Sequence, residues 1–101
     1  MARDLLDRDR LAEALATLPG WTLSDDGTAI ERLFRFSSFS EAFGFMTRVA
    51  LAAETLDHHP DWSNAYNRVS VRLTTHSAGG LTGLDIELAG VMNRLVATDR
   101  H

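Results

Sequence analysis

The stretch SFSEAFGFMTRVALAAETLDHHP, residues 38–60, carries the clearest structural pattern in the chain. Ser38 and Glu41 match a capping box, in which serine and glutamate side chains accept hydrogen bonds from the free backbone N–H groups at a helix start. Apolar residues then recur at helical spacing. They are Phe39, Ala42, Phe43, Met46, Val49, Ala50, Ala53 and Leu56. Pro60 disfavours helical geometry in the residue before it, so we predict one long amphipathic helix ending near Asp57 or His58.

The segment before this helix predicts a helix and a hairpin. The expected elements are a helix at residues 9–18 and strands at 21–23 and 30–36. Pro19 and Gly20 end the first helix. Turn-forming residues at 24–27 join the two strands. Glu31, Arg32 and Arg35 are interpreted as an ordinary strand surface.

The segment after the long helix repeats this pattern. We expect strands at residues 62–66 and 69–75, joined by Asn67 and Arg68 at two-residue hairpin spacing. Val69, Val71, Leu73 and Thr75 share one face of the second strand. Thr82-Gly83-Leu84-Asp85 matches a second capping box. It begins a last helix, whose apolar face carries Leu88, Val91, Met92 and Leu95.

The element order is therefore αββαββα. Hairpins imply an antiparallel sheet, and amphipathic helices need an apolar surface to cover. We predict an α+β two-layer domain, with a four-stranded antiparallel sheet covered on one face by helices. A chain of 101 residues without a linker corresponds to a single domain, residues 1–101.

Composition narrows the functional class. The net charge is -4 and there are no cysteines. This balance argues against a nucleic-acid partner and against attraction to anionic membranes. The absence of cysteine excludes disulfides, thiolate metal sites and cysteine nucleophiles. No signal peptide or membrane-spanning run is found, so we expect a soluble cytoplasmic protein.

Histidines are the candidate catalytic groups. His58 lies at the predicted helix end, where free carbonyl groups favour the imidazolium form. Glu54 is one helical turn earlier, and a carboxylate there would favour that form as well. A histidine charged near neutral pH can serve as a general acid. His59 precedes proline and is expected to point away from His58, and His76 lies at a strand end.

These histidines also have plainer interpretations. A helix end and a strand end can meet at one rim of a two-layer domain, where three imidazoles would form a polar pocket. Taken singly, however, a histidine at a helix terminus is usually a cap or a solvent-exposed residue. Asp85 is as well explained by its capping box as by a site role. The fourth histidine, His101, is the last residue and is set aside.

A metal site is the alternative use for the three histidines. With Asp57, Asp61 or Asp85 they could supply three or four ligands. Adjacent histidines cannot easily aim at one ion, however, and the H-x-x-x-H spacing is absent. The sequence therefore favours a site without metal.

The motif order resembles one known family. Residues 54–62, Glu-Thr-Leu-Asp-His-His-Pro-Asp-Trp, are similar to the signature of the pterin-4a-carbinolamine dehydratases (4a-hydroxytetrahydrobiopterin dehydratases). The later motifs at 66–69, 75–76 and 80–85 follow in the same order, and those at 18–21 and 34–36 precede them. The resemblance covers about residues 10–97.

The resemblance implies a fold, a reaction and a site. Family members have an α+β fold, form homodimers or homotetramers, and need no metal or organic cofactor. These lyases dehydrate 4a-hydroxytetrahydrobiopterin to quinonoid dihydropterin and water, in tetrahydrobiopterin recycling. The implied catalytic residues are His58, His59 and His76. Asp85 is the implied pocket carboxylate.

The proposed division of roles combines this resemblance with general acid/base chemistry. Dehydration needs one proton delivered to the leaving oxygen and one removed from a ring nitrogen, which histidine can do near pH 7. We predict that His58 and His76 act on opposite faces of the pterin, and that His59 orients it. Asp85 would position His76 or a ring N–H. Other substrate-binding candidates are Glu54, Pro60 and Trp62.

A binding module is the competing functional class. Some relatives of this family dimerise transcription factors or assist assembly of another enzyme. An acidic surface and exposed sheet edges would suit protein partners. The intact set of three histidines favours the enzyme over this alternative.

Overall fold

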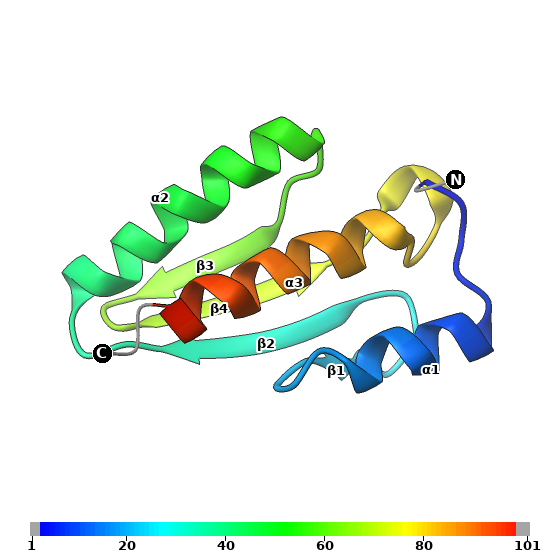
Figure 1. Cartoon of the computed structure of the whole chain (residues 1–101), viewed down its shortest axis with the longest axis horizontal. Helices are drawn as coiled ribbons and strands as arrows, with labels where there is room; N and C mark the ends of the chain where they lie inside the picture. Colours follow the sequence, from blue (N-terminus) through cyan, green and yellow to red (C-terminus); the bar gives the residue numbers. More distant parts are fainter. Residues whose placement is uncertain (1–2, 99–101) are drawn as a thin grey trace.

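A computed structural model describes residues 3–98, with the order of elements that the sequence predicts (Figure 1). The helices are α1 (Arg8–Ala16), α2 (Phe39–Leu56) and α3 (Gly83–Thr98). The strands are β1 (Thr22–Leu23), β2 (Ile30–Arg35), β3 (Asp61–Ala65) and β4 (Arg68–Leu73). They form an antiparallel sheet in the order β1-β2-β4-β3. The predicted α+β fold is confirmed, and His101 lies outside the described residues.

Two layers bury a common core. Figure 1 shows α2 and α3 lying side by side across one face of the sheet, with α1 beside the β1 edge. Val69, Val71 and Leu73 alternate along β4 and are buried beneath the helices, as predicted. Alternation places the residues between them on the uncovered face. None of the helices in residues 3–98 is long and apolar enough to cross a membrane.

Helix α2 begins as expected but buries a different face. Ser38 Oγ accepts a hydrogen bond from the Glu41 N–H, while the Glu41 carboxylate accepts one from Ser37 N rather than from Ser38 N. The buried residues of α2 are Ala42, Phe45, Val49 and Ala53. Phe39 and Phe43, which the apolar pattern included, are 49% and 54% exposed. Apolar residues lie on several sides of this helix, so periodicity alone did not fix which side meets the sheet.

The turn of the β3–β4 hairpin lies one residue earlier than predicted. Ala65 pairs with Arg68, so Tyr66 and Asn67 form the turn, with Tyr66 at φ 53°. The prediction of Asn67 and Arg68 as turn residues is wrong. A one-residue shift would turn every side chain of a strand to the opposite face, so burial of the apolar face sets the register. Asn67 Nδ2 also donates to the Phe36 carbonyl oxygen, which holds the turn beside the end of β2.

A polar cluster fixes the α1–β1 connection to α3. Asn93 Oδ1 accepts hydrogen bonds from Trp21 Nε1 (2.8 Å) and Arg32 Nη1 (2.7 Å). Asn93 Nδ2 donates to the Pro19 carbonyl oxygen. The Arg32 guanidinium also lies over the Phe34 ring, 4.3 Å from its centroid. Arg32 therefore lies on the helix-covered side, and its interpretation as ordinary strand surface is wrong.

Replacing Asn93 with alanine is expected to destabilise the fold. Trp21 is buried, and its indole N–H would lose its partner at a cost of about 1–3 kcal/mol. Urea denaturation measures the free energy of unfolding. Asn64→Ala, which removes two hydrogen bonds to carbonyl groups at the β3–β4 turn, is the control and should cost less. Equal losses in the two variants would contradict this account.

The turn between β1 and β2 contains a carboxylate with a shifted pKa. Hydrogen bonds from the Thr28 hydroxyl, the Thr28 N–H and the Ser24 hydroxyl lower the pKa of Asp26 from 3.8 to about 2. A lowered folded-state pKa stabilises the protein above the unfolded value, and that contribution is lost as pH falls towards the folded value.

The free energy of unfolding should therefore depend on Asp26 in acid. Between about pH 4 and pH 2, wild-type stability should fall more steeply than that of Asp26→Asn, because the variant has no proton to bind there. Urea denaturation across this pH range measures the two slopes. Asp25→Asn, at a neighbouring position without these hydrogen bonds, should keep the wild-type slope. Parallel curves for wild type and Asp26→Asn would exclude this role.

Candidate active site

The end of α2 turns the chain sharply inward. Asp57 adopts the left-handed conformation (φ 51°, ψ 44°), and the helix ends at Leu56, as the proline signal predicts. The His58 N–H donates to the Ala53 carbonyl oxygen and the Asp57 N–H to that of Glu54. These two bonds form a Schellman motif. Because the chain leaves the helix here, the i to i+4 spacing does not continue to His58.

His58 enters the interior and meets a buried carboxylate. Its side chain is 7% exposed, and Nε2 lies 2.6 Å from Oδ1 of Asp85, which is fully buried. Asp85 Oδ2 accepts hydrogen bonds from Thr75 Oγ1 (2.8 Å) and Thr82 N (2.9 Å). The last contact is the carboxylate half of the predicted capping box. Asp85 therefore caps α3 and holds His58 at the same time.

Glu54 pairs with the other histidine. Its Oε1 lies 2.7 Å from His59 Nε2, and the two side chains are 76% and 57% exposed. The expectation that Glu54 would act on His58 is therefore wrong, because the left-handed Asp57 redirects the chain. The expected divergence of the two histidines is present, since His58 is buried and His59 is exposed. An exposed pair of this kind contributes little to stability.

His76 lies near this cluster along the chain but is not bonded to Asp85. It begins a short 3₁₀ helix, His76–Ala78, and is exposed. The predicted positioning of His76 by Asp85 is wrong, since the carboxylate bonds to His58, Thr75 and Thr82 instead. Thr75 directly precedes His76, so the same carboxylate connects the end of α2 with the end of the β4 chain segment.

Pro60 and Trp62 lie at the same end of the sheet. Asp61 at the start of β3 pairs with Arg72 near the end of β4, which brings the two chain segments together. Both Pro60 and Trp62 are half-buried, and the Trp62 side chain packs against the hydrophobic core. Trp62 therefore forms a wall beside the histidines, one of the roles that the sequence allowed.

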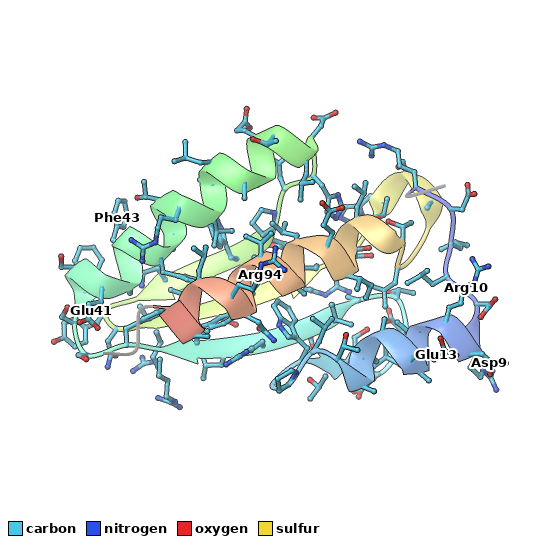
Figure 2. The ribbon with its side chains drawn as sticks, viewed as in Figure 1. Asp9, Arg10, Glu13, Glu41, Phe43 and Arg94 are labelled. Atoms are coloured by element: carbon cyan, nitrogen blue, oxygen red, sulfur yellow. The ribbon has the colours of Figure 1, made fainter. Side chains whose placement is uncertain are left out.

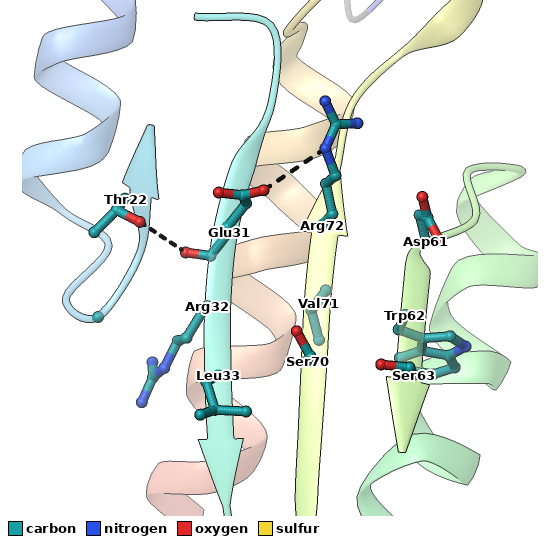
Figure 3. Close-up of a pocket in the computed structure, with 11 residues that line it drawn as sticks. Thr22, Glu31, Arg32, Leu33, Asp61, Trp62, Ser63, Ser70, Val71 and Arg72 are labelled. Atoms are coloured by element: carbon teal, nitrogen blue, oxygen red, sulfur yellow. Dashed lines mark hydrogen bonds and ion pairs between the residues drawn. The ribbon is translucent and has the colours of Figure 1, made fainter. Parts of the chain in front are cut away.

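Two surface hollows lie away from the histidines. One, of about 530 Å³, opens on the uncovered face of the sheet, where Glu31, Arg72 and Asp61 lie across three strands (Figure 3). The other, of about 1160 Å³, lies among the end of β2, the start of α2 and Val96 of α3. No described histidine lines either hollow. We take the histidine end as the candidate site because chemically competent side chains gather there, whereas the hollows follow sheet curvature and helix ends.

The donor set at this end does not form a metal centre among residues 3–98. No group of three or more histidine, aspartate or glutamate side chains there is placed to hold a metal ion. The arrangement instead provides two carboxylate–imidazole pairs. One pair is buried and one is exposed, and both use the Nε2 atom of the ring. Such pairs orient an imidazole for proton transfer.

Thr75 is a residue that the sequence analysis did not identify as part of the site. It was treated only as the last inward position of a strand. That alternation was itself a signal, because it places a hydroxyl group on the buried side, where a polar atom needs a partner. The partner, Asp85, became visible only when α3 was packed against the strand end.

Comparison with known proteins gives consistent results. The sequence model described as pterin 4 alpha carbinolamine dehydratase matches residues 4–95. A protein of Mesorhizobium japonicum is 60% identical over 92% of this chain and 95% of its own length. One of Chelativorans is 58% identical over 96% and 99%, respectively. Both carry the name pterin-4-alpha-carbinolamine dehydratase as a provisional assignment.

A solved structure shares the fold. It is the crystal structure titled transcriptional coactivator/pterin dehydratase from Brucella melitensis, which is 53% identical to this chain. The TM-score is 0.88, and the match covers 91% of this chain and 98% of the other.

Proposed function

Because this chain belongs to the pterin-4-alpha-carbinolamine dehydratase family, we propose that it dehydrates 4a-hydroxytetrahydrobiopterin to quinonoid dihydropterin and water, in tetrahydrobiopterin recycling. The C4a–O bond breaks and the hydroxyl group leaves as water after it gains a proton. The neighbouring ring N–H loses a proton as the new C=N bond forms. The products therefore require one acid and one base, and no electron acceptor.

The observation that carries this proposal is the 2.6 Å contact between His58 and the buried Asp85. A fixed imidazole can transfer protons without first reorganising. We propose His58 and His76 as the groups that exchange protons with the substrate. His59, held by Glu54, would orient the pterin beside Pro60 and Trp62. Asp85, which is fully buried, would act through His58.

A spectroscopic dehydration assay tests this function. The substrate, a 4a-hydroxytetrahydropterin, is generated in situ, and its conversion is compared with the spontaneous reaction. Wild-type protein should accelerate the reaction, and a His58→Gln/His59→Gln double variant should accelerate it far less. Wild-type turnover at the spontaneous rate would exclude the enzyme. It would favour a binding module, a possibility that the coactivator title of the Brucella melitensis structure brings to this chain.

We also propose that the protein acts as a homodimer or homotetramer. Phe39, Phe43 and Leu51 are 49%, 54% and 68% exposed and lie on one side of α2, because they are four and eight residues apart. Figure 2 shows Phe43 on the side of α2 turned away from α3. An apolar row of this kind favours helix-to-helix contact between copies.

Light scattering after gel filtration measures the mass in solution. Phe43→Ser should lower the mass, because it places a polar group in the apolar row. Leu23→Ser, at an exposed apolar position on β1, is the matched control and should keep the wild-type mass. A wild-type monomer, or equal masses for wild type and Phe43→Ser, would exclude this interface.

A further inference from the structure

The hydrogen bonds around Asp85 have one consistent direction. Asp85 is fully buried and receives donors at both oxygens, from Thr75 Oγ1 and the Thr82 N–H at Oδ2 and from His58 at Oδ1. A backbone N–H can only donate. Among the described residues no buried side-chain nitrogen or oxygen lacks a partner. The carboxylate therefore serves as an acceptor that is fully engaged.

The two threonine hydroxyls are fixed by the same bookkeeping. Thr75 has one hydroxyl proton, and it is donated to Asp85. In its 2.8 Å contact with Thr82 Oγ1, Thr75 must therefore accept, and Thr82 must donate. Thr82 Oγ1 in turn accepts from the Leu84 N–H at 3.3 Å. Thr75 and Thr82 are 3% and 0% exposed, so water does not compete strongly for these groups.

This network places the proton of the His58–Asp85 contact. A carboxylic acid has an ordinary pKa of about 3.9 and an imidazole about 6.5, so the shared proton belongs on the ring. His58 therefore donates from Nε2, and the Nδ1 atom of a neutral ring carries the lone pair. Nδ1 makes no hydrogen bond with residues 3–98, and no atom of that region is both buried and without a partner. Nδ1 therefore reaches the accessible surface.

We infer that Thr75 and Thr82 are positioning residues that fix Asp85, and through it the Nε2–H tautomer of His58, so that Nδ1 is the nitrogen that meets the substrate. The tautomer follows from the contacts alone, whereas the role of Nδ1 in proton transfer rests on the proposed dehydratase function. Thr75 also precedes His76 and pairs with Gly80 through its backbone. One residue thereby fixes the ring of one proposed catalytic histidine and the backbone at the base of the other.

Nitrogen-15 NMR of histidine-labelled protein tests the tautomer without any substrate. His58→Gln identifies the His58 resonances by their loss. In the wild type, neutral His58 should show a protonated Nε2 and an unprotonated Nδ1. Thr75→Val keeps the branched shape of the side chain but removes the hydroxyl group. It should produce a mixture of tautomers, whereas Thr75→Ser should keep the wild-type signals.

Kinetics on the in situ 4a-hydroxypterin gives the second readout. Thr75→Val should lower kcat about 10- to 100-fold, the usual cost of losing a group that orients an active residue, with little change in KM. Thr75→Ser should restore kcat. Thr74→Val is the matched control, because the adjacent Thr74 hydroxyl bonds to the Thr28 carbonyl oxygen and not to Asp85. It should keep both the tautomer and the wild-type kcat.

The outcomes separate the two proposals. A wild-type spectrum with the proton on Nδ1 overturns the inference, and that measurement needs no variant to fold. An unchanged tautomer and kcat in folded Thr75→Val also overturn it. Wild-type protein that shows the predicted tautomer but no dehydration would remove the proposed function, while the positioning of His58 by Thr75 would stand.

Discussion

Replacement of His58 by glutamine is expected to lower kcat for dehydration about 10²–10⁴-fold, the usual contribution of a positioned acid or base. Glutamine can still donate a hydrogen bond towards Asp85, but it cannot take up and release a proton near neutral pH. The loss should therefore fall on kcat. Steady-state kinetics on the in situ 4a-hydroxypterin measures it.

Alanine at the same position separates chemistry from folding. His58→Ala leaves the buried Asp85 without its partner at Oδ1, and breaking a buried pair costs about 3–5 kcal/mol of unfolding free energy. His58→Gln should cost clearly less. A change in stability alone, with the kcat of folded His58→Gln close to the wild-type value, would remove His58 from the chemistry.

His59→Gln is the matched comparison for this prediction. His59 is exposed, and its carboxylate partner Glu54 is exposed as well. If His59 chiefly orients the pterin, its replacement should raise KM more than it lowers kcat. A larger loss of kcat in His59→Gln than in His58→Gln would reverse the proposed roles of the two histidines.

Asp85→Asn is expected to reduce both stability and kcat. Three donors converge on this carboxylate, from His58, Thr75 and Thr82. The asparagine amide has one accepting oxygen, so at least one donor would face the NH₂ group. Each buried donor left without an acceptor costs about 1–3 kcal/mol.

The catalytic loss follows from the same mismatch. An NH₂ group facing His58 requires Nε2 to accept, which moves the ring proton to Nδ1. The wrong tautomer would then meet the substrate, and an aspartate-to-asparagine change with this consequence costs about 10⁴ in kcat in a serine-protease triad. We expect a loss of about 10²–10⁴-fold here, measured in the same assay.

Glu54→Gln is the control for the stability effect. It alters the exposed carboxylate–imidazole pair and should change the free energy of unfolding by no more than about 1 kcal/mol. Combining Asp85→Asn with His58→Gln should cost less than the sum of the single losses, because both changes act on one contact. Additive losses in that double variant, or equal stability of Asp85→Asn and wild type, would contradict the proposed network.

The sequence alone determined the local elements of this protein. Helix spacing and strand alternation depend on residues close together in the chain, so both signals were readable before packing was known. The Ser38 capping box and Pro60 correctly bounded α2. The Thr82–Asp85 capping box correctly began α3, because such a box closes within one helical turn.

Tertiary structure decided which of these groups meet. Glu54 pairs with His59 rather than His58 because the left-handed Asp57 breaks helical spacing between them. Sheet burial, rather than turn preference, moved the hairpin turn to Tyr66 and Asn67.

The histidines from which the function was inferred were visible in the sequence, but the partner that orients His58 was not. His58 and Asp85 are 27 residues apart, and Thr75 lies between them in the chain. No local period relates their positions. Their contacts depend on packing α3 against the ends of α2 and β4, where a buried carboxylate must satisfy its oxygens with whichever donors the fold brings to it.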